Sequence, residues 1–181
     1  QTLNNNVRKL VTQIPNLLQS ISTLTRYKIS DHFNQEDQQS LKIRYNSRQC
    51  LRQIQEYGDP QVQSELLKVG YVILLAISFS TAGGIGEEQN KEIWNGLNCI
   101  YWFLLDLHKG RNIDQIPSFQ PLPQLVRRSE EQIEEEGANE EIETQMKNIG
   151  SNGNIKDWAN LAKAASLNRF IHKSNLLLRS F

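Results

Sequence analysis

Three arginines spaced four residues apart form the most suggestive chemical pattern in the sequence. Arg44, Arg48 and Arg52 fall on one side of an α-helix, because four residues span slightly more than one helical turn. Guanidinium groups in such a row can bind phosphates or an acidic protein helix through paired hydrogen bonds. The alternatives are a solvated helix face or pairing with an acidic segment of the same chain, since most runs of charge are ordinary surface.

A second group of basic residues lies near the C-terminus. Residues 151–181 contain five Lys or Arg against one Asp or Glu, a net charge of +4. Lys163, Arg169 and Lys173 are the members of this group that we expect to contribute to a macromolecule-binding surface. Together with the arginine row, they make up the predicted binding residues.

The remaining polar residues predict no catalytic, metal or cofactor site. His32, His108 and His172 are far apart and form no metal-like pattern, and His108 is expected to place a cation at the negative end of a helix. The glutamates of residues 130–141 are expected to be solvated, whereas acid–base pairs need a shielded pocket. The glycines of residues 83–86 lack the preceding strand and the Lys-Ser/Thr pair of a phosphate-binding loop.

Cys50 and Cys99 are the only cysteines, and both occur among apolar residues at helical spacing, so we expect both to be buried. Their pattern suggests neither a disulfide framework nor a metal site, which favours the cytoplasm or another reducing compartment. The first residues show no charged segment followed by an apolar run, so no signal peptide is expected.

The period of the apolar residues predicts an all-α protein. Four long amphipathic helices are expected between residues 3 and 110, each with an apolar stripe wide enough for a globular bundle. The stripes are Leu3, Val7, Leu10, Ile14, Leu17, Ile21 and Leu24; Ile43, Ser47, Cys50, Ile54 and Tyr57; Val62, Leu66, Val69, Ile73 and Ala76; and Ile93, Leu97, Ile100, Leu104 and Leu107. Short joints between these helices favour an antiparallel four-helix bundle.

Turn and capping residues mark the expected helix boundaries. Pro15 is predicted to kink the first helix, because a proline inside a helix removes a hydrogen bond and clashes with the preceding turn. Asp31 or Asn34 can cap the second helix, and Gly58 can end it. Asp59 and Pro60 suit the cap and first residue of the third helix. Glycines 83–86 and Gly110 end the third and fourth helices.

These elements suggest four parts of the chain. They are a four-helix core over residues 1–110, a proline-rich crossover over 111–126, an acidic helical segment over 127–149 broken near Gly137, and a basic amphipathic helix within 150–181 that packs on the core. The apolar run Leu66–Ile85 approaches the ~20 residues of a membrane span. Gly70 and Lys68 interrupt it, however, so we expect a buried bundle helix.

Charge is distributed unevenly although the formal net charge is zero. Residues 1–58 carry +4, residues 59–126 carry −3 and residues 127–150 carry −5. Attraction between these segments inside the fold is the simplest use of the pattern.

The absence of a catalytic pattern and the polar helix faces lead us to expect a non-enzymatic helical scaffold that binds another protein. Homo-oligomerisation is an open alternative. One alternative is a viral matrix-like or nucleocapsid-associated adaptor that binds nucleic acid or an acidic membrane surface. The other is an enzyme with a dispersed site.

Overall fold

The computed structural model describes residues 14, 16–27, 37–80, 87–148 and 154–167, and within them the protein is all-α, as expected. Strands are absent from these ranges, although Arg111 and Phe119 form one isolated antiparallel bridge. The helices are α2 Leu17–Leu24, α3 Asp37–Tyr57, α4 Pro60–Lys68, α5 Tyr71–Ser80, α6 Glu87–Lys109, α7 Pro123–Glu135, α8 Ala138–Gln145 and α9 Asn154–Ser166.

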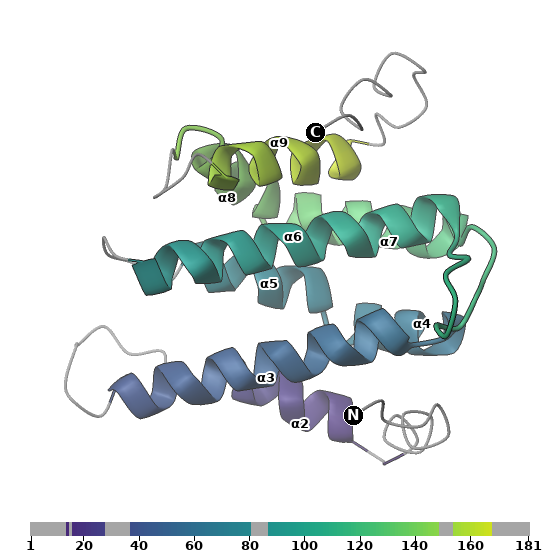
Figure 1. Ribbon diagram of the computed structural model, residues 1–181, viewed down its shortest axis with the longest axis horizontal. Coiled ribbons are helices and arrows are strands. Elements are labelled where there is room, and N and C mark those ends of the chain that lie inside the picture. The colour runs from purple at the N-terminus through teal and green to yellow at the C-terminus, as the bar shows by residue number, and fades with distance from the viewer. Residues whose placement is uncertain (1–13, 15, 28–36, 81–86, 149–153, 168–181) are drawn as a thin grey trace.

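The helices are arranged as three adjacent antiparallel pairs (Figure 1). α2 pairs with α3, α5 pairs with α6, and α8 pairs with α9, whereas α7 packs behind α6. The second members α3, α6 and α9 form the layer nearest the viewer and run in the same direction, with α6 in the middle. The structure therefore does not confirm the expected antiparallel four-helix bundle, because the long helices α3 and α6 are parallel neighbours.

The centre of the core is α5, which contacts α3, α4, α6, α7 and α8. Seven of its ten residues are buried apolar residues, so it lacks the polar face that an exposed helix has. Tyr71 of α5 packs edge-to-face on Phe103 of α6, with ring centroids 5.3 Å apart. Among the described residues no single helix is long and apolar enough to cross a membrane; α4 and α5 pass this test only together, and they are bent by 58°.

The bend between α4 and α5 corrects the expected continuous third helix. Gly70 lies between them with φ of 72°, a left-handed conformation that costs other residues about 1–2 kcal/mol. The expected start of this segment is confirmed: Asp59 caps α4 by accepting a hydrogen bond from the Val62 amide at 3.1 Å, and Pro60 is the first helical residue. The apolar period continued across the glycine and concealed the break.

The first segment is shorter than expected where it can be described. Asn16 has φ of 62°, and α2 begins only at Leu17, so the helix does not run unbroken through this position. The predicted kink at Pro15 and the stripe from Leu3 to Leu10 lie outside the described residues, as do the proposed caps Asp31 and Asn34 and glycines 83–86.

The segment after α6 confirms the break at Gly110 and shifts the next boundary. Gly110 has φ of 72°, and a Cβ there would lie 2.5 Å from the Phe119 carbonyl oxygen. The crossover ends at Leu122 rather than residue 126, because Pro123 begins α7 as its first residue. Gly137 separates α7 from α8, as predicted. The C-terminal helix, expected within 150–181, is described only as α9 up to Ser166.

Candidate interaction surface on α3, α6 and α9

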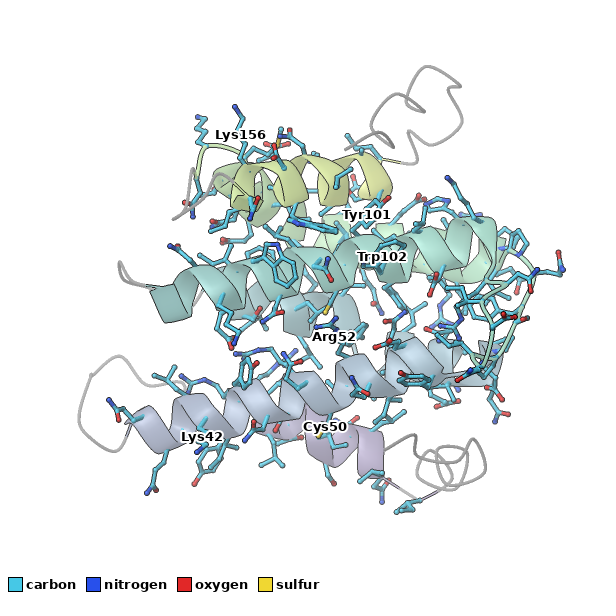
Figure 2. The ribbon with its side chains drawn as sticks, in the orientation of Figure 1. Lys42, Cys50, Arg52, Tyr101, Trp102 and Lys156 are labelled. Carbon is cyan, nitrogen blue, oxygen red and sulfur yellow. The ribbon has the colours of Figure 1, made fainter. Side chains whose placement is uncertain are left out.

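The three predicted arginines of α3 do not form a uniform exposed row. Arg44 donates a hydrogen bond from Nη1 to the carbonyl of Tyr27 at 2.8 Å, which ties α3 to the end of α2. Arg48 forms an ion pair with Glu92 of α6, and both side chains are largely buried. Arg52 lies on the near face of the molecule between α3 and α6 (Figure 2). Two of the three guanidinium groups thus hold neighbouring elements together.

Arg52 borders a buried pair formed by Tyr71 and Cys99. Burial raises the pKa of Cys99 to about 11, and the positive charge of Arg52 only partly opposes this effect. Burial also raises the pKa of Tyr71. Cys99 is therefore a protonated core residue at neutral pH and no thiolate nucleophile. Cys50, in contrast, is exposed, which corrects the expectation that both cysteines are buried.

In the described part of the chain, the basic C-terminal group contacts the acidic segment through Lys163. Lys163 of α9 contacts Glu143 of α8 at 2.7 Å, and its hydrogen bond lowers the pKa of that glutamate. This pair is an example of the internal attraction that the charge pattern suggested. The other two members of the group, Arg169 and Lys173, lie outside the described residues.

The two basic helices do not join into one patch. α3 and α9 lie on opposite sides of α6, so the middle of this face belongs to α6 (Figure 1). Figure 2 shows Lys42 and Arg52 on α3, Trp102 on α6 and Lys156 on α9, all on the same face. This face therefore carries one exposed aromatic residue on its middle helix and separate cations on the two outer helices.

Trp102 belongs to a chain of aromatic contacts between α6 and α9. Its ring lies 5.2 Å from that of Tyr101, which lies 5.7 Å from Trp158 of α9. Trp158 also packs on Trp94 at 5.9 Å. All three tryptophans of the chain are in this cluster, and Trp102 is its most exposed member, with 46% of its surface accessible. The ring of Trp102 joins this cluster through its contact with Tyr101.

Sequence reasoning missed Trp102, although a signal was present. The apolar stripe of this helix contains Ile100 and Leu104, and a residue two positions away points to roughly the opposite side of an α-helix. A tryptophan outside the stripe should therefore lie at the surface. An exposed aromatic residue in that position is informative, because burial is its usual state.

Arg111 was also missed, and the structure makes it a buried structural clasp. Its guanidinium donates to the carbonyls of Glu56 at 2.9 Å, Gln55 at 3.2 Å and Gly58, all at the end of α3. It pairs with Asp106 of α6 at 3.2 Å and donates to the Pro117 carbonyl at 3.1 Å. The guanidinium carbon also lies 4.7 Å from the centre of the Phe119 ring. These contacts join α3, α6 and the crossover.

His108 is at the end of α6, as expected, but does not serve there as an exposed cation. Burial lowers its pKa, and a hydrogen bond to the backbone of Ala165 in α9 opposes the shift. Its Nε2 lies 3.7 Å from the Glu130 carboxylate, whose pKa is raised by burial. The helix end favours the charged imidazole, but the surroundings favour the neutral one.

Two hollows are lined by residues that the structure describes. A cavity between α3, α5 and α6 has a volume of about 10 Å³, enough for one water molecule. An open depression of about 510 Å³ follows the backbone of the crossover near Lys109 and Gln120. Among the described residues, no three His, Cys, Asp or Glu side chains are grouped so that they could hold a metal ion. The surface around Trp102 is thus the most distinctive feature.

In comparisons with protein-family models, with curated proteins and with solved structures, the chain matches none of them.

Proposed function

We propose that this chain is a non-enzymatic protein–protein interaction module that binds its partner on the face formed by α3, α6 and α9. The observation that carries the proposal is the exposed Trp102 at the edge of the aromatic cluster between α6 and α9. Tryptophan is enriched among the few residues that supply most of the binding energy of protein interfaces. A rigid aromatic side chain also loses little conformational entropy when a partner covers it.

The polar surroundings of Trp102 resemble the rim of an interface. Arg52, Lys42 and Lys156 lie on the same face, on the helices to either side of α6. Such charges contribute to orientation and to the rate of association more than to affinity. α6 separates the cations of α3 from the cation of α9, and it carries an aromatic residue on the same face. This arrangement favours a protein over the phosphate backbone of a nucleic acid.

Photo-crosslinking tests this proposal directly. A photoreactive amino acid replaces Trp102 in one variant and Ile113 in a control variant, because Ile113 is equally exposed but lies on the crossover. In extracts of the source cells, position 102 should give a discrete protein adduct that position 113 does not give. Equal labelling at both positions, or no adduct at 102, would refute the proposed face. An adduct that nuclease removes would show that the partner is a nucleic acid.

A further inference from the structure

We infer that one partner for this face is a second copy of the chain, which presents the acidic surface of α7 and α8. This inference rests on the proposed function and names the partner for the same face. We call Lys42, Arg52, Lys91 and Lys156 the basic face. We call Glu134, Glu135, Glu136 and Glu140 the acidic edge.

The cations of the basic face are available for a partner. Lys42, Lys91 and Lys156 are exposed, and Arg52 is half-buried. Lys91 precedes Trp102 by eleven residues, which is three turns of α6, so both point to the same side. Within the described residues, none of the four forms an ion pair, whereas neighbouring Arg48 is paired with Glu92. A partner that meets this face must therefore accommodate several cations.

The acidic edge is exposed in the same way. The side chains of Glu134, Glu135, Glu136 and Glu140 are all exposed. The ion pairs of α7 and α8 in the described structure involve other glutamates: Arg127 with Glu131, Lys163 with Glu143, and the long contact of His108 with Glu130. None of the four glutamates of the edge has an ion pair among the described residues.

Three of these glutamates are placed where they do not help the fold. Glu134 and Glu135 end α7, and Glu136 is its C-cap, so their charges lie at the negative end of the helix dipole. They also repel one another. Folding stability gives no reason for this arrangement, whereas a cationic surface docked from outside would relieve the repulsion. The complementary surface is present on the same chain.

The positions of the two surfaces determine the kind of assembly. α7 and α8 lie behind α6 and α9, whereas the basic face is on the near side (Figures 1 and 2). The contact therefore joins different surfaces of two copies, head to tail, and each added copy leaves one surface of each kind free. Exposed ion pairs are weak and are screened by salt, so the assembly should require high protein concentration and low ionic strength.

Sedimentation velocity of the full chain tests this inference. At low ionic strength the average mass should rise with concentration above the 20.9 kDa of one chain, and high salt should reverse the rise. Two variants provide the decisive comparison. Arg52→Glu with Lys156→Glu reverses the basic face, and Glu134→Lys with Glu135→Lys reverses the acidic edge. Each variant alone should remain monomeric with unchanged helical circular dichroism, and mixing the two should restore association.

Wild-type protein that stays monomeric at low salt would overturn the inference, and so would variants that still associate alone or fail to associate when mixed. These results are separate from the proposed function. A chain that does not self-associate, yet is cross-linked to another protein at position 102, would keep its interaction role and lose only this partner.

Discussion

The Arg111 clasp allows the sharpest test of how the long helices are held together. Replacing Arg111 by Met keeps most of the aliphatic stem next to Phe119 but removes every hydrogen bond of the guanidinium. The carbonyls of Gln55, Glu56 and Gly58 then lose a donor at the end of α3. The carboxylate of Asp106, whose side chain is 13% exposed, loses its ion pair and keeps the hydrogen bond from Gln55 at 3.3 Å.

The magnitude follows from the buried, unpaired charge. Removing one member of a buried ion pair typically costs about 3–5 kcal/mol. The carbonyls of Gln55 and Gly58 keep the hydrogen bonds from Gln63 Nε2 at 2.9 and 3.1 Å, so the lost hydrogen bonds to the carbonyls add less than the ion pair does. We therefore expect Arg111→Met to lower the free energy of unfolding by about 3–5 kcal/mol. Asp106→Asn in the same background should recover about 1 kcal/mol or more, because it removes the unpaired charge.

The pH dependence provides an independent check. Burial raises the pKa of Asp106, and Arg111 is the main group that opposes this rise. Without Arg111 the pKa rises further. A carboxyl whose folded pKa is raised stabilises the fold at low pH, and that stabilisation is lost as the pH rises through the folded pKa. The loss in the free energy of unfolding caused by Arg111→Met should therefore become smaller as the pH falls.

Urea unfolding followed by far-ultraviolet circular dichroism measures these changes. Arg127→Met is the matched control, because Arg127 is 82% exposed and pairs with Glu131 one turn away at 3.0 Å. It should cost no more than about 0.5 kcal/mol. An Arg111→Met loss below about 1 kcal/mol, in the range of an exposed pair, would refute the reasoning.

Two further predictions concern the core and the end of α6. Leu74→Ala and Leu104→Ala should each lower the free energy of unfolding in urea by about 2–5 kcal/mol, because both side chains are buried. Leu41→Ala should change it by no more than about 0.5 kcal/mol, because Leu41 is exposed. Equal losses at all three positions would contradict the assignment of the core. Burial lowers the pKa of His108 from its ordinary 6.5, so as the pH falls the imidazole is protonated in the unfolded chain before it is protonated in the folded one. The free energy of unfolding should therefore decrease as the pH drops below 6.5. Removing the imidazole by His108→Gln should flatten this part of the pH profile. An unchanged profile would show that His108 is not responsible.

The helices were predictable where a regular apolar period met a capping residue or a glycine. The stripe from Ile93 to Leu107 and the break at Gly110 correspond to α6, and Asp59 with Pro60 gives the start of α4. Gly70 was harder to interpret, because the apolar residues on both sides remain in phase and only the backbone conformation separates α4 from α5. Local periodicity does not record such a bend.

The arrangement of the helices and the partners of charged residues were not predictable in the same way. The spacing of Arg44, Arg48 and Arg52 gives a common helix side, but the pairing of Arg48 depends on Glu92, 44 residues away in the sequence. Arg111 acts through carbonyls more than 50 residues distant. Cys50 looked buried because its helical phase matches the stripe of α3, yet the neighbouring helices leave that position exposed. Long-range packing decides each of these cases.

The pairing of Arg48 also affects how the binding face should be tested. A glutamate at position 48 would lie beside Glu92 and would disturb the contact between α3 and α6, so loss of binding could follow from loss of structure. Trp102 is the better probe, because its exposed ring can be truncated without opening the core.

The partner protein that is captured by cross-linking at position 102 allows the most direct test of the central claim. This partner is purified and titrated separately with the wild-type chain, with Trp102→Ala and with Ile113→Ala. If Trp102 anchors the interface, its truncation should raise the dissociation constant about 30-fold or more, as expected for a residue that contributes at least ~2 kcal/mol to the binding free energy. Ile113→Ala should bind like the wild type. A Trp102→Ala affinity within about twofold of the wild type, below the size of any interface hot spot, would contradict the account.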